Sequence, residues 1–267
     1  MEEEVKTNYK NWLPKGMMLG LVAAAVIAVV LFLVIAVYGF WVRGTARILL
    51  GVLLGLGSLV LVAGAVWSVV AYRVFTFDKP NSLARKIIDG TADYVSIPAG
   101  GKGLDVGCGS GALTIACAKR NPKATFLGVD RWGPEYASFS LALCQRNAEA
   151  EGVSNVSFQK GDAVKLDFPD ETFDAVTSNY VYHNVVGADK QGLLLETLRV
   201  LKKGDTFAIH DLMSQVRYGD MQAFVAKLKE QGYERVELID TTDGKFVSPN
   251  RARILLLQGS TLLIGKK

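Results

Sequence analysis

A glycine-rich turn carries the strongest chemical signal in this sequence. Residues 104–111 read LDVGCGSG, which places an acidic residue, Asp105, just before the glycines Gly107, Gly109 and Gly111. Glycines allow a tight turn and bring the backbone against a ligand without side-chain obstruction. The turn therefore predicts a binding site for a cofactor that carries a nucleoside. Its spacing also satisfies the looser dinucleotide fingerprint G-x-G-x-x-A, so the kind of cofactor stays open at this point.

Two further acidic residues follow the turn, each at the end of a predicted strand. Asp130 comes about 20 residues later, where a carboxylate can accept hydrogen bonds from both hydroxyls of a ribose. A helix cap or a solvated turn is the structural alternative for Asp130. Asp162 stands in the sequence Gly161-Asp162-Ala163 after the next predicted strand. Three acidic residues after three successive strands indicate one binding pocket more specifically than any of them alone.

The chain has only two histidines, and both follow predicted strands. His183 lies just past the fourth strand, whereas His210 ends the fifth, with Asp211 beside it. A histidine is suited to remove a proton near neutral pH if the acceptor of a transferred group carries one. We therefore predict His183, and after it His210, as catalytic. A loop hydrogen bond and a place in the packing of the sheet are the alternatives. Asn179, at the end of the fourth strand, is predicted to line the cofactor site.

Strands and helices alternate from Ser82 to the C-terminus. This alternation predicts an α/β fold: a Rossmann-like, seven-stranded, mostly parallel sheet with helices on both faces. Ligands of such sheets bind beyond the carboxyl ends of the strands, where the residues above are expected to meet. The predicted strands are Gly103–Val106, Thr125–Asp130, Val156–Lys160, Phe173–Ser178, Thr206–Asp211, Arg235–Asp240 and Ser260–Ile264. The predicted helices are 82–97, Ala112–Arg120, Pro134–Glu151, Lys190–Leu201 and Asp220–Gln231.

The first 75 residues have a different composition, with two runs that contain no charge. One lies between Lys15 and Arg43 and the other between Arg47 and Arg73. Because about 20 apolar residues suffice to cross a bilayer, each run predicts a transmembrane helix. Two buried helices of a soluble core are the alternative, although such helices normally keep a polar stripe.

The short connection between the runs predicts an antiparallel hairpin that precedes the α/β domain. Small residues at Ala23–Ala25, Gly51 and Gly55 would let its helices approach closely. Phe40 and Trp41 are expected at one membrane interface. The predicted organisation is a cytoplasmic segment 1–15, a two-helix hairpin 16–73, a linker 74–82 and a catalytic domain 83–267.

Lysine and arginine are more frequent at the outer ends of the hairpin than in its loop, which predicts both termini in the cytoplasm. The protein is thus expected in the cell membrane as a multi-pass protein bound to the lipid bilayer through its hairpin. After residue 75 the chain holds 24 basic and 23 acidic residues, so no nucleic acid is predicted as a partner. Its three cysteines lack the paired spacing of metal ligands, so no metal is predicted.

Five motifs together resemble the class I S-adenosylmethionine-dependent methyltransferase family: LDVGCGSG, GVD, GDA, DFPDETFDAV and LRVLKKGD. The resemblance covers roughly Ala84 to the C-terminus, and the ubiquinone/menaquinone C-methyltransferases are the branch that is most similar in pattern. It implies S-adenosyl-L-methionine as the cofactor and methyl transfer as the reaction. The cofactor-binding residues that it implies are Asp105, Gly107, Cys108, Gly109 and Gly111 at the methionyl end, Asp130 at the ribose, and Arg131, Asp162 and Ala163 at the adenine.

One departure from the quinone branch lies in the segment after the fourth predicted strand. The branch often has Leu-His-His where this chain has Tyr182-His183-Asn184, so the second histidine is missing. The sequence therefore does not decide whether a quinone is the methyl acceptor. Motifs typical of enzymes that methylate adenine, glutamine amides or cytosine are missing. The expected substrate is a small, amphiphilic or membrane-resident molecule. A cofactor-sensing or scaffolding membrane protein and a nicotinamide-dependent oxidoreductase are the alternatives, and the sequence predicts no oligomeric state.

Overall fold

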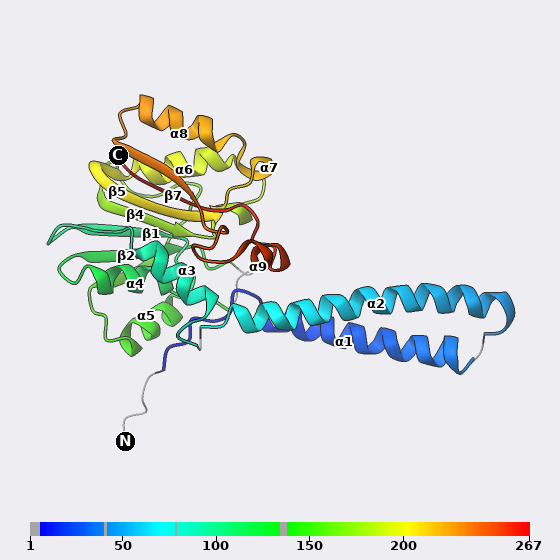
Figure 1. Cartoon of the computed structure of the whole chain (residues 1–267). Coiled ribbons are helices and arrows are strands. Elements are labelled where there is room, and N and C mark those ends of the chain that lie inside the picture. The colour runs from blue at the N-terminus through cyan, green and yellow to red at the C-terminus, as the bar shows by residue number, and fades with distance from the viewer. Residues whose placement is uncertain (1–5, 40–41, 78, 134–137) are drawn as a thin grey trace, which may run out of the picture. The chain divides into compact units, whose positions relative to one another are not determined.

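A computed structural model describes residues 6–39, 42–77, 79–133 and 138–267 (Figure 1). The chain forms two compact units. One is Asn11–Ser82, and the other combines Met1–Lys10 with Leu83–Lys267. Phe40 and Trp41, predicted at an interface, and the first residues of the predicted helix Pro134–Glu151 lie outside the described residues.

The smaller unit is a pair of helices that pack along each other. Helix α1 (Lys15–Phe32) runs into the π-helical turn η1 (Leu33–Val37), and α2 (Gly44–Val74) follows. The predicted close approach at two glycines is confirmed. A Cβ atom on Gly51 would lie 3.0 Å from the Cβ of Ala36, and one on Gly55 would lie 3.2 Å from the Phe32 ring. Small residues thus bring the two backbones together.

Both helices of this unit are long and strongly apolar. Lys15–Val37 has a mean hydropathy of 3.2 over its most apolar window, and Gly44–Val74 has 2.5. Large apolar side chains point outward along both helices; Val60, for example, is 72% exposed. By length and composition each helix is able to cross a membrane. The side chain of Arg47 donates hydrogen bonds to the carbonyls of Ala36 and Val37, at 2.6–3.0 Å, and so satisfies carbonyls at the end of η1.

The larger unit contains one seven-stranded sheet in the order β3-β2-β1-β4-β5-β7-β6. Neighbouring strands are parallel except for β7, which is antiparallel to β5 and to β6. The predicted fold class is thereby confirmed. The strands are β1 (Lys102–Val106), β2 (Thr125–Asp130), β3 (Val156–Lys160), β4 (Phe173–Asn179), β5 (Leu201–Leu212), β6 (Arg235–Asp240) and β7 (Ser260–Lys266).

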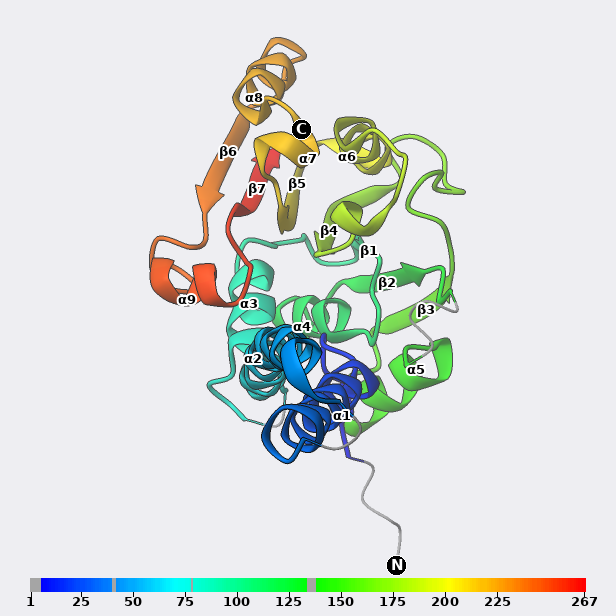
Figure 2. The ribbon, with the colours of Figure 1, turned by 90° about the vertical axis from the view of Figure 1, so that its right-hand side faces the viewer.

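Helices cover both faces of this sheet, with α3, α4 and α5 on one face and α6 and α8 on the other (Figures 1 and 2). The strand order changes direction between β1 and β4, which is where ligands bind in open α/β sheets. The helices are α3 (Leu83–Ala92), α4 (Ala112–Arg120), α5 (Leu141–Ala150), η3 (Tyr182–Asn184), α6 (Lys190–Arg199), α7 (Gln215–Tyr218), α8 (Met221–Glu230) and α9 (Pro249–Ile254).

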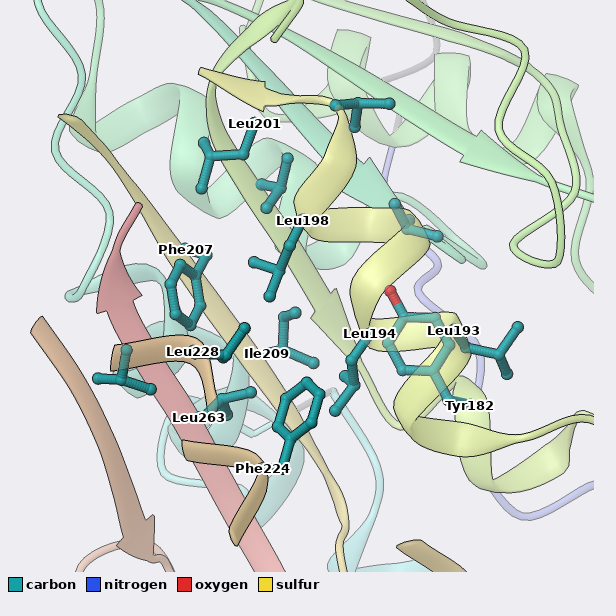
Figure 3. Packing of buried hydrophobic residues seen from close by; sticks show 14 of the residues in the cluster. Tyr182, Leu193, Leu194, Leu198, Leu201, Phe207, Ile209, Phe224, Leu228 and Leu263 are labelled. Carbon is teal, nitrogen blue, oxygen red and sulfur yellow. The ribbon is translucent and has the colours of Figure 1, made fainter. Parts of the chain in front are cut away.

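A continuous apolar core lies between the sheet and the helices α6 and α8 (Figure 3). Leu194 and Leu198 of α6 meet Phe207 of β5, and Phe224 and Leu228 of α8 complete the layer. Each of these side chains is at most 2% exposed, and burial of one such side chain stabilises the fold by about 1.5–3 kcal/mol. This packing holds β5 rigidly, and with it the residues at its carboxyl end.

Candidate functional site

The glycine turn joins β1 to α4 with a backbone that only glycine adopts readily. Gly107, Gly109 and Gly111 have φ of +74°, +56° and +83°. A Cβ atom on Gly107 would also lie 2.3 Å from a methyl carbon of Val181, which follows β4. The glycine therefore permits both the left-handed turn and the close packing of the turn against the segment after β4.

Asp105 supports this turn from inside the domain. Its carboxylate is 1% exposed and accepts hydrogen bonds from the hydroxyls of Thr114 (2.6 Å) and Thr177 (2.9 Å). Burial raises the pKa of Asp105 to about 7, although the two hydroxyl hydrogen bonds act against this rise. Because Thr114 lies in the first turn of α4, Asp105 connects β1, β4 and this helix. The predicted contact of Asp105 with the methionyl end of the cofactor stays a prediction, and the structure shows the residue behind the turn.

The first turn of α4 offers backbone donors to a ligand. Its N-cap residue, Gly111, has no side chain that could satisfy them, and within the described residues only the N–H of Thr114 is taken up, by the Asp105 carboxylate. A Cβ atom on Gly109 would project into space whose nearest atoms are ring carbons of Phe139 at 4.0 Å. A turn that is partly exposed at Gly107 and Gly109, with amides at a helix start, fits a ligand that carries a carboxylate. Cys108, by contrast, is buried, and burial raises the pKa of its thiol, so it faces the interior while its backbone forms the turn.

Asp130, at the end of β2, lies directly beside the turn. One carboxylate oxygen accepts from the N–H of Gly109 at 2.9 Å, and the other accepts from the N–H of Trp132 at 2.7 Å. The Trp132 indole donates to the Gly109 carbonyl at 2.9 Å and closes this group of contacts. Each carboxylate oxygen can accept a second hydrogen bond, so the residue can hold the turn and bind two hydroxyls of a ligand at once.

The residues predicted around the adenine are less closely organised. Asp162 is exposed and accepts from the N–H of Val164 at 2.9 Å, which stabilises its own turn after β3. Ala163 packs against the core, and Arg131 is exposed after β2. The structure thus brings Asp130 and the glycine turn together. It places Asp162, Ala163 and Arg131 after the neighbouring strand ends, and their adenine contacts stay predictions.

His183 is held by a carboxylate that is fully buried. Its Nδ1 forms a short hydrogen bond with Asp211 of β5, and its backbone N–H donates to the same carboxylate at 3.2 Å. Asp211 also accepts from the Tyr218 hydroxyl at 2.9 Å and from the N–H of Leu212 at 2.7 Å. Burial works to raise the pKa of Asp211, yet the hydrogen bonds and the charge of His183 outweigh it, and the pKa is lowered.

This arrangement fixes the His183 ring and leaves Nε2 without a hydrogen-bond partner among the described residues. The side chain as a whole is 17% exposed, and Nε2 is its one ring nitrogen that no described residue occupies. Such a histidine, oriented by a carboxylate at Nδ1, can accept a proton at Nε2.

His210 lies in a different environment from His183. It is fully buried, and its two ring nitrogens lie 2.9 Å from Asn179 Oδ1 and 2.9 Å from Thr241 Oγ1. Burial lowers the pKa of His210 to about 4, so the ring is neutral. Both ring nitrogens are hydrogen-bonded within the protein, and the predicted catalytic role of His210 stays a prediction. The Asn179 side chain contacts His210, and its predicted contact with the cofactor stays a prediction.

Sequence reasoning missed two supports of the site. Asp211 was considered only as a neighbour of His210, although residues 210 and 211 of a strand must point to opposite faces. Asn147 of α5 donates to the carbonyl of Ser110 in the glycine turn at 2.9 Å. Its Oδ1 accepts from the N–H of Asn8 at 2.7 Å, so the segment before α1 also supports the turn from behind. No short motif marks such a contact across 139 positions.

Comparison with known proteins identifies the family. Residues 97–244, more than half of the chain, match the family model of a methyltransferase domain. Among individual relatives, the sterol 24-C-methyltransferase erg6 of Aspergillus fumigatus is 34% identical over 128 residues, which are 48% of this chain and 32% of that protein. The demethylmenaquinone methyltransferase of Thermus thermophilus is 38% identical over 106 residues, which are 40% of this chain and 44% of that protein. The matches thus span less than half the length of both relatives.

A solved structure supports the fold. The [4+2]-cyclase SpnF superposes with a TM-score of 0.53 at 19% identity, over 71% of this chain and 85% of that one. At this identity the similarity concerns the fold alone.

Proposed function

This chain belongs to the methyltransferase domain family, and on that basis we propose that it transfers a methyl group from S-adenosylmethionine to a small, lipophilic acceptor in or at a membrane. The chain is an S-adenosylmethionine-dependent enzyme by its family. The class of acceptor is the part that we infer. It is supported by relatives that are named for sterol and demethylmenaquinone methylation, and by the two apolar helices.

The cofactor site is assigned to the glycine turn. The first-turn amides of α4 would receive the methionyl carboxylate, and Asp130 would accept from the ribose hydroxyls. Asp105 would keep the turn in place beside the methionyl end of the cofactor. When bound there, S-adenosylmethionine supplies an electrophilic methyl group.

His183 is the residue that we propose to handle the proton of the acceptor. The geometry that carries this proposal is the hydrogen bond between Nδ1 and Asp211, because it leaves Nε2 as the nitrogen available to a substrate. As the new bond to the methyl group forms and the sulfur–methyl bond breaks, the acceptor loses its proton to Nε2. The positive imidazolium that results lies beside the carboxylate of Asp211, which stabilises it.

The two-helix unit is proposed as a membrane anchor, with residues 16–73 in the bilayer, residues 1–15 and the catalytic domain 83–267 in the cytoplasm, and 74–82 as the linker. A tether of this kind raises the effective concentration of the active site at the surface where lipophilic acceptors gather.

Methyl transfer is tested with the purified full-length protein, radiolabelled methyl donor and a membrane lipid extract. We expect label in the organic phase, in a species that mass spectrometry identifies. The His183→Ala variant should lose this labelling while it keeps its affinity for S-adenosylhomocysteine. If lipid extracts yield no label but a water-soluble extract does, the acceptor class proposed here is wrong. If no extract yields label although the cofactor binds, the sensing or scaffolding role replaces the enzyme.

A further inference from the structure

Two short helices at one end of the sheet, α7 and α9 (Figure 1), carry exposed valine, leucine and arginine side chains on themselves or just beyond them. Helix α7 carries Val216, which is 98% exposed, followed by the exposed Arg217. Helix α9 carries the exposed Arg251 and Arg253, and Leu256 just beyond it is 65% exposed. These five residues are called the arginine–apolar rim below.

The segment just before α7 contacts the segment that follows α9. The N–H of Met213, just before α7, donates to the carbonyl of Gly259, just after α9, at 2.8 Å. A Cβ atom on Gly259 would lie 3.3 Å from the Cβ of Ser214. The segments that carry the rim are therefore in contact where β5 ends and β7 begins.

The two segments that carry the rim are basic and contain no acid themselves, and the exposed Asp220 and Asp243 lie just outside them. Residues 214–219 and 244–259 contain no aspartate or glutamate. No carboxylate in the described part of the chain forms an ion pair with a rim arginine. Elsewhere in the same unit the pattern differs: Arg120 pairs with Asp89 and Asp93, and Arg199 pairs with Asp170 and Glu196. The rim arginines thus keep their donors for a partner.

We propose that the arginine–apolar rim binds the headgroup region of an anionic lipid surface. Guanidinium groups pair well with lipid phosphates, and basic side chains are attracted to an anionic membrane surface. Exposed valine and leucine side chains between them can enter the boundary between headgroups and acyl chains. A purely polar partner such as a nucleic acid would leave these apolar side chains in water.

The position of the rim relative to the site gives this contact a function. Tyr218 of α7 donates to Asp211, and Asp211 holds the proposed base His183. A membrane contact through α7 would therefore bring the helix that supports Asp211 and His183 to the lipid surface, where lipophilic acceptors concentrate. This inference rests on the proposed function, because the anchor is what brings the domain to the membrane.

The test uses the full-length protein in lipid vesicles, with a fluorophore on a single introduced cysteine. Labelling will be selective because Cys108, Cys117 and Cys144 are all buried. The rim positions are probed by Val216→Cys and Leu256→Cys. The matched control is Lys203→Cys, whose native side chain is 81% exposed at the opposite, amino end of β5. Lipids that carry a nitroxide on the headgroup quench a fluorophore only when it lies at the surface.

We expect quenching at positions 216 and 256 to exceed that at position 203 several-fold on vesicles containing phosphatidylglycerol. It should fall to the level of the control on pure phosphatidylcholine. Adding Arg251→Glu and Arg253→Glu to the Leu256→Cys protein should abolish the excess, with unchanged quenching in the Lys203→Cys protein. Equal quenching at all three positions would overturn the inference. So would unchanged quenching at position 256 after Arg251→Glu and Arg253→Glu.

Two controls separate this inference from the proposed function. Vesicle flotation is measured first, and a full-length protein that fails to float would refute the anchor itself. A protein that floats but shows no excess quenching at the rim would refute the lipid contact alone. Disulfide cross-linking between Val216→Cys protomers without excess quenching would assign the rim to a second copy of the chain.

Discussion

Asp211 contacts His183 twice, through the ring nitrogen Nδ1 and through the backbone N–H. The two residues come from neighbouring strands of the sheet, since His183 follows β4 and Asp211 lies near the end of β5. One buried carboxylate thereby fixes both the position of the loop and the orientation of the imidazole.

Replacing Asp211 by asparagine should slow methyl transfer about 100-fold, because the imidazole loses the charge that orients and stabilises it. The readout is the rate of label incorporation at saturating methyl donor. Affinity for S-adenosylhomocysteine should stay near that of the wild type. The double variant with His183→Ala should be no slower than His183→Ala alone, since the two residues act as one unit. If the double variant is slower than either single variant by the product of their two effects, Asp211 acts on the rate independently of His183.

The buried imidazole of His210 should make stability depend on pH. Its pKa is about 4 in the folded protein, against the ordinary histidine value of 6.5 for the unfolded chain, so the unfolded chain binds the proton first as the pH falls. Its stabilising contribution is complete above pH 6.5 and is lost toward pH 4, by at most about 3 kcal/mol. The raised pKa of Asp105 acts in the opposite sense, so the comparison is between wild type and His210→Asn over this range.

The direct check is an NMR titration of the wild-type protein in detergent. Only two histidines contribute imidazole signals, and His183→Ala identifies the other. A His210 signal that titrates above pH 6 would contradict the buried, neutral assignment.

Substitution of Gly107 by alanine should lower stability by more than about 2 kcal/mol, because left-handed strain adds to the clash with Val181. The matched control is Gly100→Ala. Gly100 has φ of +80°, but a Cβ atom there would meet nothing within 4 Å, so it reports strain alone. The loss should be measured as a shift in the midpoint of thermal unfolding.

Adding Val181→Ala to Gly107→Ala should recover the part of this loss that is due to the clash. If Gly107→Ala destabilises no more than Gly100→Ala, the close packing between the turn and the segment after β4 is not important for the fold.

The sheet could be predicted well from the sequence, because buried parallel strands appear as apolar runs that are bounded by turn residues. The bounds of β2, β3 and β6 are as predicted, and β1 begins one residue earlier than predicted. Helices α7 and α9 were missed, since four and six residues are too few to show a helical period. Helix α3 ends at Ala92 instead of continuing to residue 97.

The site was harder to predict because its geometry depends on which face of each strand meets the neighbouring loop. The alternation of a strand separates His210 from Asp211 but does not say which of them faces the site. The structure turns Asp211 toward His183 and buries His210 on the other side. The support of the glycine turn by Asn147 depends on tertiary packing that no local pattern encodes.

The most direct test of the account is calorimetric titration of the full-length protein with S-adenosylhomocysteine, comparing wild type, Asp130→Ala, Asp130→Asn and the exposed-carboxylate control Asp167→Ala. We predict measurable binding by wild type and by Asp167→Ala. Binding should weaken at least about 100-fold in Asp130→Ala, because two charge-assisted hydrogen bonds of about 1.5–3 kcal/mol each are lost. Asp130→Asn should fall between the two. Unchanged affinity in Asp130→Ala, or a folded wild-type protein that does not bind the ligand, would contradict the cofactor site described here.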